Sequence, residues 1–193
     1  MYSAAFEKAV DHAMLYEVGG FWKLTPEVEA GLISTPAQKK AVGYVNDPLD
    51  RGGETKFGVA KNANPELDIT NLTWAEAKDV YYKKYWLASK CDQLPGRYAA
   101  LHFDIAVNSG PGRAAKFLQR ALGLTDDGSI GPVTLKAANE ADVFLLCESV
   151  CLQREQFYNN IVAKDPSQSR FINGWMRRVN ELRAFVSDPT REF

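Results

Sequence analysis

Three polar side chains between residues 17 and 55 have the types and surroundings that acid–base cleavage of a glycosidic bond requires. Glu17 stands among apolar residues such as Leu15 and Val18, and partial burial there raises the pKa of a carboxyl and keeps it protonated near neutral pH. Asp50 lies in a polar turn rich in proline and glycine, where we expect it to stay ionised. Thr55 follows two glycines and offers a hydroxyl that can orient water. A protonated acid and an ionised carboxylate are the pair that glycosidases use.

Each of the three residues also has a simpler interpretation. A glutamate at a helix end before two glycines is commonly a solvated residue. An aspartate in a turn of this kind commonly forms an Asx turn, and a single threonine after two glycines carries little information. The residue types alone therefore leave the chemistry open.

The elements that must position these residues are mainly helices. Apolar residues recur with a period near 3.6 over residues 2–17 and predict an amphipathic helix that ends at Val18-Gly19-Gly20. Thr25-Pro26 and Thr35-Pro36 each predict a short helix that begins with a capping threonine. The same kinds of signal predict further helices over 73–87, where the first residues have capping-box spacing, and over 99–107, 111–123, from 132, 142–162 and 169–186.

Residues 43–60 form the one segment with β character. Tyr44-Val45 and Lys56-Phe57-Gly58-Val59 predict short strands, with Asn-Asp-Pro and Arg-Gly-Gly turns between them. The predicted fold class is therefore mainly α, of the α+β type, with a helical bundle lobe and a small β-hairpin lobe.

Composition and charge exclude several classes of protein. The chain has 193 residues, of which 46% are hydrophobic and 24% charged, as in ordinary globular proteins. A net charge of −1 gives no general attraction to nucleic acid, and no apolar stretch is long enough for a transmembrane helix. Glu7, Asp11 and His12 interrupt any signal-peptide pattern. We expect synthesis in the cytoplasm and export by a route that another protein provides.

The cysteines and histidines predict no metal centre and no cofactor. Cys147 and Cys151 share a helical face, but no nearby histidine or further cysteine completes a zinc site. Together with Cys91 they form a sparse, odd set that predicts buried reduced thiols. His102 lies in an apolar helix, where a structural role is expected rather than a catalytic one.

The segment Gly43–Val59, GYVNDPLDRGGETKFGV, resembles the signature of phage-type muramidases of glycoside hydrolase family 108. In that family a helix ends in Glu-Gly-Gly-Tyr and leads into Val-Asn-Asp-Pro-x-Asp-x-Gly-Gly-x-Thr. The resemblance implies that Glu17 is the catalytic acid, Asp50 its acidic partner and Thr55 the family's hydroxyl. Here residues 18–42 intervene after the glutamate, which we interpret as an insertion. The other glutamates that remain candidates for the acid are Glu27, Glu29 and Glu54.

The second half resembles the peptidoglycan-binding region found in the same proteins, over residues 103–123 and 127–132. Its broad apolar helix faces and the lack of a linker predict one lysozyme-like domain over residues 1–193. We expect a catalytic half at 1–92, a helical half at 93–193 and a substrate cleft between the two lobes.

Three further residues are predicted to bind substrate, each with an open alternative. Tyr44 has the type of ring that stacks on a sugar, or it belongs to the core. Asn108 and Gln119 offer amides for sugar hydroxyls or N-acetyl groups, or they are a helix C-cap and a surface residue. The last helix carries a basic cluster that is either a solvated face or an aid in approaching an anionic wall or membrane: Arg170, Arg177, Arg178 and Arg183.

The resemblance implies hydrolysis of the β-1,4 bond between N-acetylmuramic acid and N-acetylglucosamine in bacterial peptidoglycan by a monomer. A phage or prophage endolysin, which reaches the wall through another protein's pore, fits this expectation. A lytic transglycosylase is the second interpretation, although Asp50 and Thr55 as a water-handling pair argue against it. The third is a non-catalytic protein that binds peptidoglycan. No nucleic-acid partner is expected.

Overall fold

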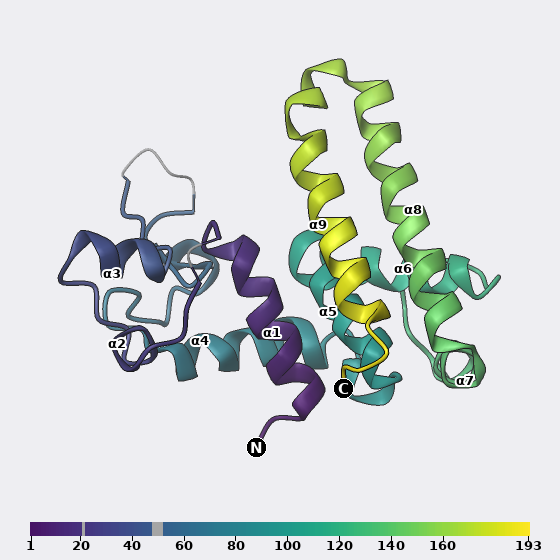
Figure 1. Cartoon of the computed structure of the whole chain (residues 1–193), viewed down its shortest axis with the longest axis horizontal. Coiled ribbons are helices and arrows are strands. Elements are labelled where there is room, and N and C mark those ends of the chain that lie inside the picture. The colour runs from purple at the N-terminus through teal and green to yellow at the C-terminus, as the bar shows by residue number, and fades with distance from the viewer. Residues whose placement is uncertain (21, 48–51) are drawn as a thin grey trace. The chain divides into compact units, whose positions relative to one another are not determined.

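A computed structural model describes residues 1–20, 22–47 and 52–193 (Figure 1). The described chain is mainly helical, and its only sheet has two short antiparallel strands. It divides into two compact units, one of residues 10–84 and one of residues 1–9 with 85–193. The predicted fold class, mainly α with a small hairpin, is confirmed. The single domain over 1–193 stays a prediction.

The unit of residues 10–84 holds short elements around a hairpin. Helix α1 (Ala4–Glu17) enters it and ends there at Glu17. The elements that follow are α2 (Pro26–Glu29), α3 (Pro36–Ala41), β1 (Thr55–Lys56), β2 (Val59–Ala60), the 3-10 turn η1 (Lys61–Ala63), α4 (Trp74–Tyr81) and the π-helical segment η2 (Tyr82–Leu87), which continues past the unit.

The three predicted threonine caps are confirmed. The hydroxyl oxygens of Thr25, Thr35 and Thr73 each accept a hydrogen bond from the backbone amide three residues on. The predicted capping box at Thr73 is present with Glu76, and Thr35 forms a second one with Gln38. Each cap satisfies amides that a helix start leaves without partners.

The hairpin differs from the prediction in its register. Lys56–Val59 is not one strand, because the chain reverses at Phe57 and Gly58, and Lys56 pairs with Val59. Both turn residues have positive φ, 53° and 72°, as the tight type I′ hairpin turn requires. Val45 forms only an isolated bridge with Thr55. The turn is therefore two residues long and presents Gly58 at its tip.

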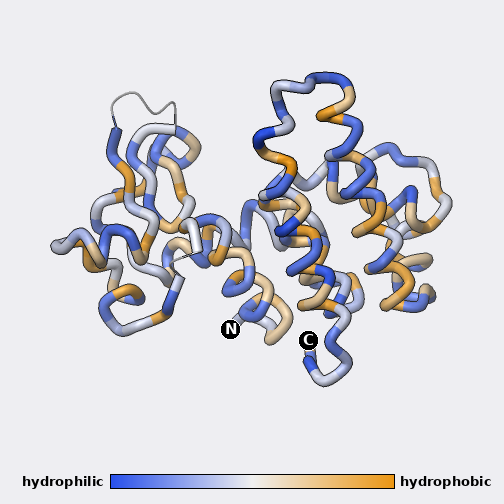
Figure 2. Tube along the Cα trace, turned by 45° about the horizontal axis from the view of Figure 1, so that its top comes forward, coloured by the Kyte–Doolittle hydropathy of each residue, from blue (hydrophilic) through white to orange (hydrophobic). Residues whose placement is uncertain are grey.

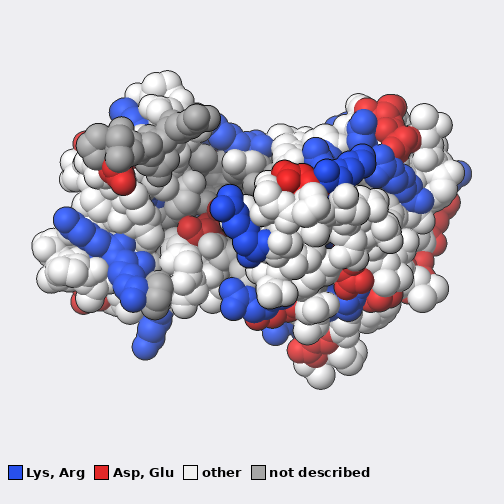
Figure 3. Space-filling view, turned by 90° about the horizontal axis from the view of Figure 1, so that it is seen from above, with Lys and Arg blue, Asp and Glu red and all other residues white. Residues whose placement is uncertain are grey.

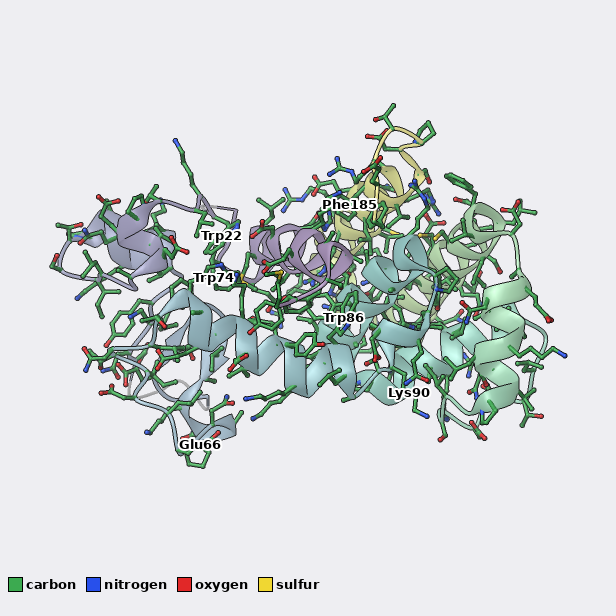
Figure 4. All side chains as sticks on the ribbon, turned by 90° about the horizontal axis from the view of Figure 1, so that it is seen from below. Trp22, Glu66, Trp74, Trp86, Lys90 and Phe185 are labelled. Atoms are coloured by element: carbon green, nitrogen blue, oxygen red, sulfur yellow. The ribbon has the colours of Figure 1, made fainter. Side chains whose placement is uncertain are left out.

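An aromatic cluster anchors the base of this turn. The Phe57 side chain is fully buried and its ring lies 5.6 Å from that of Trp74 and 6.2 Å from that of Trp22, centroid to centroid. Trp22 and Trp74 lie side by side with centroids 4.7 Å apart (Figure 4). Phe57 keeps an unfavourable backbone conformation because this packing holds its side chain.

The second unit is a helical bundle. Its elements are the 3-10 turn η3 (Cys91–Gln93), α5 (Gly96–Ser109), α6 (Pro111–Ala121), α7 (Pro132–Glu140), α8 (Val143–Lys164), the 3-10 turn η4 (Pro166–Gln168) and α9 (Ser169–Ser187). Every residue of α5 from Tyr98 to Ala106 is buried, as expected of a helix that is apolar nearly all round. Helices α8 and α9 form an antiparallel hairpin (Figure 1).

Hydropathy along the chain follows this packing. In Figure 2 hydrophobic and hydrophilic stretches alternate within most helices, as in helices with one buried face. No helix among the described residues is long and apolar enough to cross a membrane.

A buried ion-pair network joins three helices of the bundle. The carboxylate of Asp104 on α5 accepts from Arg154 Nη1 on α8 at 3.1 Å and from Arg178 Nη2 on α9 at 2.8 Å. Asp104 and Arg154 are each 1% exposed. This arrangement corrects the prediction of a basic cluster on α9, because Arg178 is buried and Arg183 pairs with Glu148 and Glu155.

Acidic and basic side chains are interspersed on the face of the molecule shown in Figure 3. This distribution agrees with the net charge of −1. Of the four arginines that suggested a basic face, Arg170 and Arg177 remain exposed. Arg170 lies over the Phe171 ring, with its guanidinium carbon 4.6 Å from the ring centroid.

The cysteines and His102 lie in the interior, as predicted. All three thiols are free and buried, and burial raises the pKa of Cys147 to about 12 and that of Cys151 to about 11. His102 is fully buried, and its Nδ1 lies 3.2 Å from the Tyr98 hydroxyl. Its Nε2 has no hydrogen-bond partner among the described residues. Burial lowers the pKa of His102 to about 3, so the ring is neutral in the folded chain.

Because of His102, we expect the folded chain to lose stability in acid. The pKa of His102 is about 3 when folded and 6.5 in its ordinary state, so the unfolded chain takes up the proton first as pH falls. The contribution of neutral His102 to the free energy of unfolding is fully present above pH 6.5 and is lost progressively toward pH 3. We expect urea unfolding of the wild type to lose about 2 kcal/mol from this group between about pH 7.5 and about pH 5. A His102→Gln variant should lose correspondingly less over that interval, and an equal pH dependence in both proteins would contradict the assignment.

Candidate active site

The site begins at the end of α1, where Glu17 is the last helical residue. Met14 and Val18, one turn before it and directly after it, are buried, whereas Glu17 itself is half-buried. Gly19 and Gly20 follow with φ of 71° and 80°, and this left-handed backbone ends the helix. Glu17 therefore stands at a helix end and is partly shielded from water.

The tip of the hairpin packs directly against this carboxyl. A β-carbon added at Gly58 would lie 3.5 Å from Glu17 Oε2 and 3.2 Å from Glu17 Cβ. The same atom would lie only 2.4 Å from the hydroxyl oxygen of Tyr81. Only a residue without a side chain lets the turn, the carboxyl and the phenol come this close.

Tyr81 fixes the turn in this position. Its side chain is buried at the end of α4, and its hydroxyl donates a 2.9 Å hydrogen bond to the carbonyl oxygen of Phe57. A buried bond of this kind stabilises one arrangement of the turn against alternatives. Gly58 and Tyr81 were not among the residues predicted from sequence, because nothing in their local pattern indicates that a distant helix meets the hairpin tip.

Gly58→Ala should damage the site and the fold together. The new methyl group would clash with the Tyr81 hydroxyl at a position whose φ of 72° already disfavours a side chain. We expect a loss of about 1–3 kcal/mol in the free energy of unfolding and reduced hydrolysis of peptidoglycan, measured by urea unfolding and by turbidity. Gly174→Ala is the matched control, since nothing lies within 4 Å of its added carbon. It lies inside α9, where alanine is favoured over glycine. Equal stability and activity of the Gly58→Ala variant and wild type would overturn this description.

Two further predicted residues lie on the hairpin. Thr55 is half-buried on β1, and its hydroxyl donates to the Gly53 carbonyl oxygen at 3.2 Å. The Tyr44 hydroxyl donates to Glu54 Oε1 at 2.8 Å, and this bond raises the pKa of the phenol. Thr70 donates to the same Glu54 oxygen. The substrate contact predicted for Tyr44 stays a prediction.

The competing glutamates have surroundings unlike that of Glu17. Glu54 braces the hairpin through the two hydroxyls just described. Glu27 and Glu29 are exposed in the first turn of α2. Hydrogen bonds from its own backbone amide and from Thr25 lower the pKa of Glu27, which is the wrong direction for a group that must carry a proton. Asp50 lies outside the described residues.

Asn108 and Gln119 belong to the helical unit. Asn108 is exposed in the last turn of α5 and accepts a 2.8 Å hydrogen bond from the Tyr158 hydroxyl. Gln119 is buried rather than at the surface, and its amide donates to Asp127 and to the carbonyl of Ser129. It also accepts from Gly128. The bonds of Gln119 brace its own turn, and sugar binding by either residue stays a prediction.

Comparisons with known proteins find two family models and similar solved structures. Residues 38–110 match the family model of glycosyl hydrolase 108, and residues 113–180 match a predicted peptidoglycan domain. Among solved structures, SagA from Brucella abortus is similar with a TM-score of 0.68 and 27% identity. That similarity covers 97% of this chain and 96% of SagA. No curated protein matches the chain.

The chain is therefore a glycoside hydrolase with a mainly α, lysozyme-like fold. Its residues 38–110 match glycosyl hydrolase family 108, a peptidoglycan domain follows at residues 113–180, and the chain is a peptidoglycan hydrolase of the muramidase type. The family assignment made from residues 43–59 is confirmed.

Proposed function

We propose that this hydrolase cuts the β-1,4 bond between N-acetylmuramic acid and N-acetylglucosamine, with Glu17 as the general acid. The observation that carries the proposal is the packing of the hairpin tip against the Glu17 carboxyl. A β-carbon added at Gly58 would lie 3.5 Å from Glu17 Oε2. The matched hydrolase segment begins at residue 38, after Glu17. The assignment of the acid therefore depends on the packing of Gly58 against Glu17 and on the position of Glu17 at a helix end just before Gly19 and Gly20.

In the proposed reaction Glu17 donates its proton to the leaving glycosidic oxygen as the bond to the sugar carbon breaks. Asp50 stabilises the positive charge that develops on the sugar ring, or it takes a proton from the water molecule that adds to the sugar carbon. The Thr55 hydroxyl orients that water. The steps use only side chains of this chain and water.

The fragments released from purified peptidoglycan test which bond is cut. We expect soluble muropeptides that end in a reducing N-acetylmuramic acid, which borohydride reduces and mass spectrometry then identifies. Anhydro ends, lighter by one water, would make the enzyme a lytic transglycosylase. Reducing N-acetylglucosamine ends would move the cut to the other glycosidic bond. Binding without any release would leave the non-catalytic alternative.

We also propose a setting in which the enzyme acts as a phage or prophage endolysin and works as a monomer. The support is the likeness of residues 43–59 to phage-type muramidases. Expression alone should leave bacterial cells intact, whereas co-expression with a pore-forming protein should lyse them. Lysis without the pore protein would contradict this route to the wall.

A further inference from the structure

A groove in the helical unit gathers positive charge and lies outside the residues discussed above. It has a volume of about 390 Å³ and is lined by residues of α6 and α8: Gly112, Arg113, Lys116, Phe117, Arg120 and Phe157. None of these lining residues is acidic. Arg113, Lys116 and Arg120 follow one another at helical spacing, so their side chains form a stripe about 10 Å long on one face of α6.

Two of the three cations form no ion pair with the residues that the structure describes. Arg120 forms an ion pair with Asp126. Arg113 and Lys116 are exposed and make no hydrogen bond or ion pair with any residue that the structure describes. Lys116 also interacts electrostatically with the carboxylates of Asp126 and Asp127, so the guanidinium of Arg113 is the cation most available to a ligand at the groove.

The guanidinium of Arg113 is also pre-positioned. Its central carbon lies 4.5 Å from the centroid of the Phe157 ring. The Phe157 ring in turn forms a T-shaped pair with Phe117, with centroids 5.7 Å apart. Stacking on an aromatic ring holds the plane of a guanidinium while its N–H groups stay free at the edge. Two neighbouring N–H groups of a guanidinium can donate two parallel hydrogen bonds to the two oxygens of a carboxylate.

We propose that this groove binds carboxylates of the peptidoglycan stem peptides, so that the helical unit recognises the peptide part of the wall. The inference rests on the proposed function, because peptidoglycan supplies the ligand. Stem peptides carry several carboxylates at intervals of a few ångströms along an extended chain, as a stripe of cations requires. The groove lies at residues 112–157, largely within the segment that matches a predicted peptidoglycan domain.

The test measures sedimentation with intact sacculi that have been freed of phosphate polymers, so that phosphate is not a competing ligand. All proteins carry Glu17→Gln, which prevents digestion during binding. Arg113→Ala/Lys116→Ala should bind about five- to thirty-fold more weakly than its parent, as expected for two exposed charge contacts. Lys136→Ala/Arg170→Ala is the matched control, since it removes the same charge from the same unit and Arg170 also lies over a phenylalanine ring. The control should bind like the parent.

A second set of sacculi, whose carboxylates have been converted to neutral amides, identifies the ligand. The parent protein should bind these sacculi as weakly as the groove variant does, and the two proteins should no longer differ. Equal binding of parent and groove variant to untreated sacculi would overturn the proposal. A deficit that persists on the amidated sacculi, or one seen equally with vesicles of phosphatidylglycerol, would overturn the assignment to stem-peptide carboxylates. Failure of the proposed function is distinct, since it appears as the absence of reducing muramic ends after digestion by the wild type.

Discussion

Replacing Glu17 with glutamine should lower the rate of peptidoglycan hydrolysis by about 10²–10⁴-fold while leaving the fold intact, because a positioned general acid contributes this much. Glutamine has the same shape as the protonated acid but no proton to give. Loss of turbidity of purified peptidoglycan measures the rate, and circular dichroism with urea unfolding checks the fold. Because Glu17 is half-buried at a helix end, we expect the substitution to be tolerated structurally.

The other glutamates provide the control for this experiment. Glu27→Gln and Glu29→Gln alter exposed side chains of α2 and should keep wild-type activity. Glu54→Gln keeps an oxygen that can accept from Tyr44 and Thr70, and should retain most of the activity. If the Glu17→Gln variant were active and one of these three inactive, the assignment of the acid to Glu17, before the insertion of residues 18–42, would be wrong, and the inactive variant would identify the acid.

Replacing Asp104 should cause a large loss of stability. Asp104→Ala leaves the guanidinium groups of Arg154 and Arg178 buried without their carboxylate. Breaking a buried pair in this way costs about 3–5 kcal/mol, mainly because the remaining charge is uncompensated. Urea unfolding measures the effect. Asp126→Ala breaks the exposed pair with Arg120 and is the matched control, with an expected cost of about 0–1 kcal/mol.

A second variant keeps the prediction testable if Asp104→Ala does not fold. Arg178→Met removes one buried positive charge together with its hydrogen bonds, and leaves Asp104 paired with Arg154. We expect it to be less destabilising than loss of the shared carboxylate. The double variant Asp104→Asn/Arg178→Met should be less destabilised than the single variants Asp104→Asn and Arg178→Met added together, because each substitution removes a charge that the other leaves without its partner. Additive losses would show that the network is not coupled.

Local signals predicted most of the helices. Thr25, Thr35 and Thr73 mark helix starts through hydrogen bonds to residues only a few positions away, so their sequence neighbourhood contains the needed information. The same is true of the buried stretch at Tyr98–Ala106, which is apolar enough to require burial on all sides.

The positions that the sequence did not predict depend on distant parts of the chain. The hairpin turn at Phe57 and Gly58 requires packing of Phe57 against Trp22 and Trp74, which overrides the poor preference of phenylalanine for positive φ. Tyr81 reaches the hairpin from α4, 24 residues along the chain. The burial of Arg178 likewise depends on Asp104, 74 residues before it.

For the candidate site, motif and geometry contributed differently. The spacing around residues 43–59 identified the family and so the class of reaction. It did not identify what surrounds Glu17, because Gly58 meets the carboxyl, and Tyr81 holds the turn that carries Gly58, only in the folded chain. Gln119 shows the reverse error: an amide on a helix was expected at the surface, yet it is buried and braces a turn.

The most direct test of the central claim is to count the new reducing N-acetylmuramic acid ends that wild type and Glu17→Gln release from the same peptidoglycan. The account predicts that wild type releases such ends steadily and that folded Glu17→Gln releases them at least about a hundred-fold more slowly. Equal release by the two proteins would contradict the role of Glu17 as the acid. Release of no reducing muramic ends by the wild type would contradict muramidase activity itself.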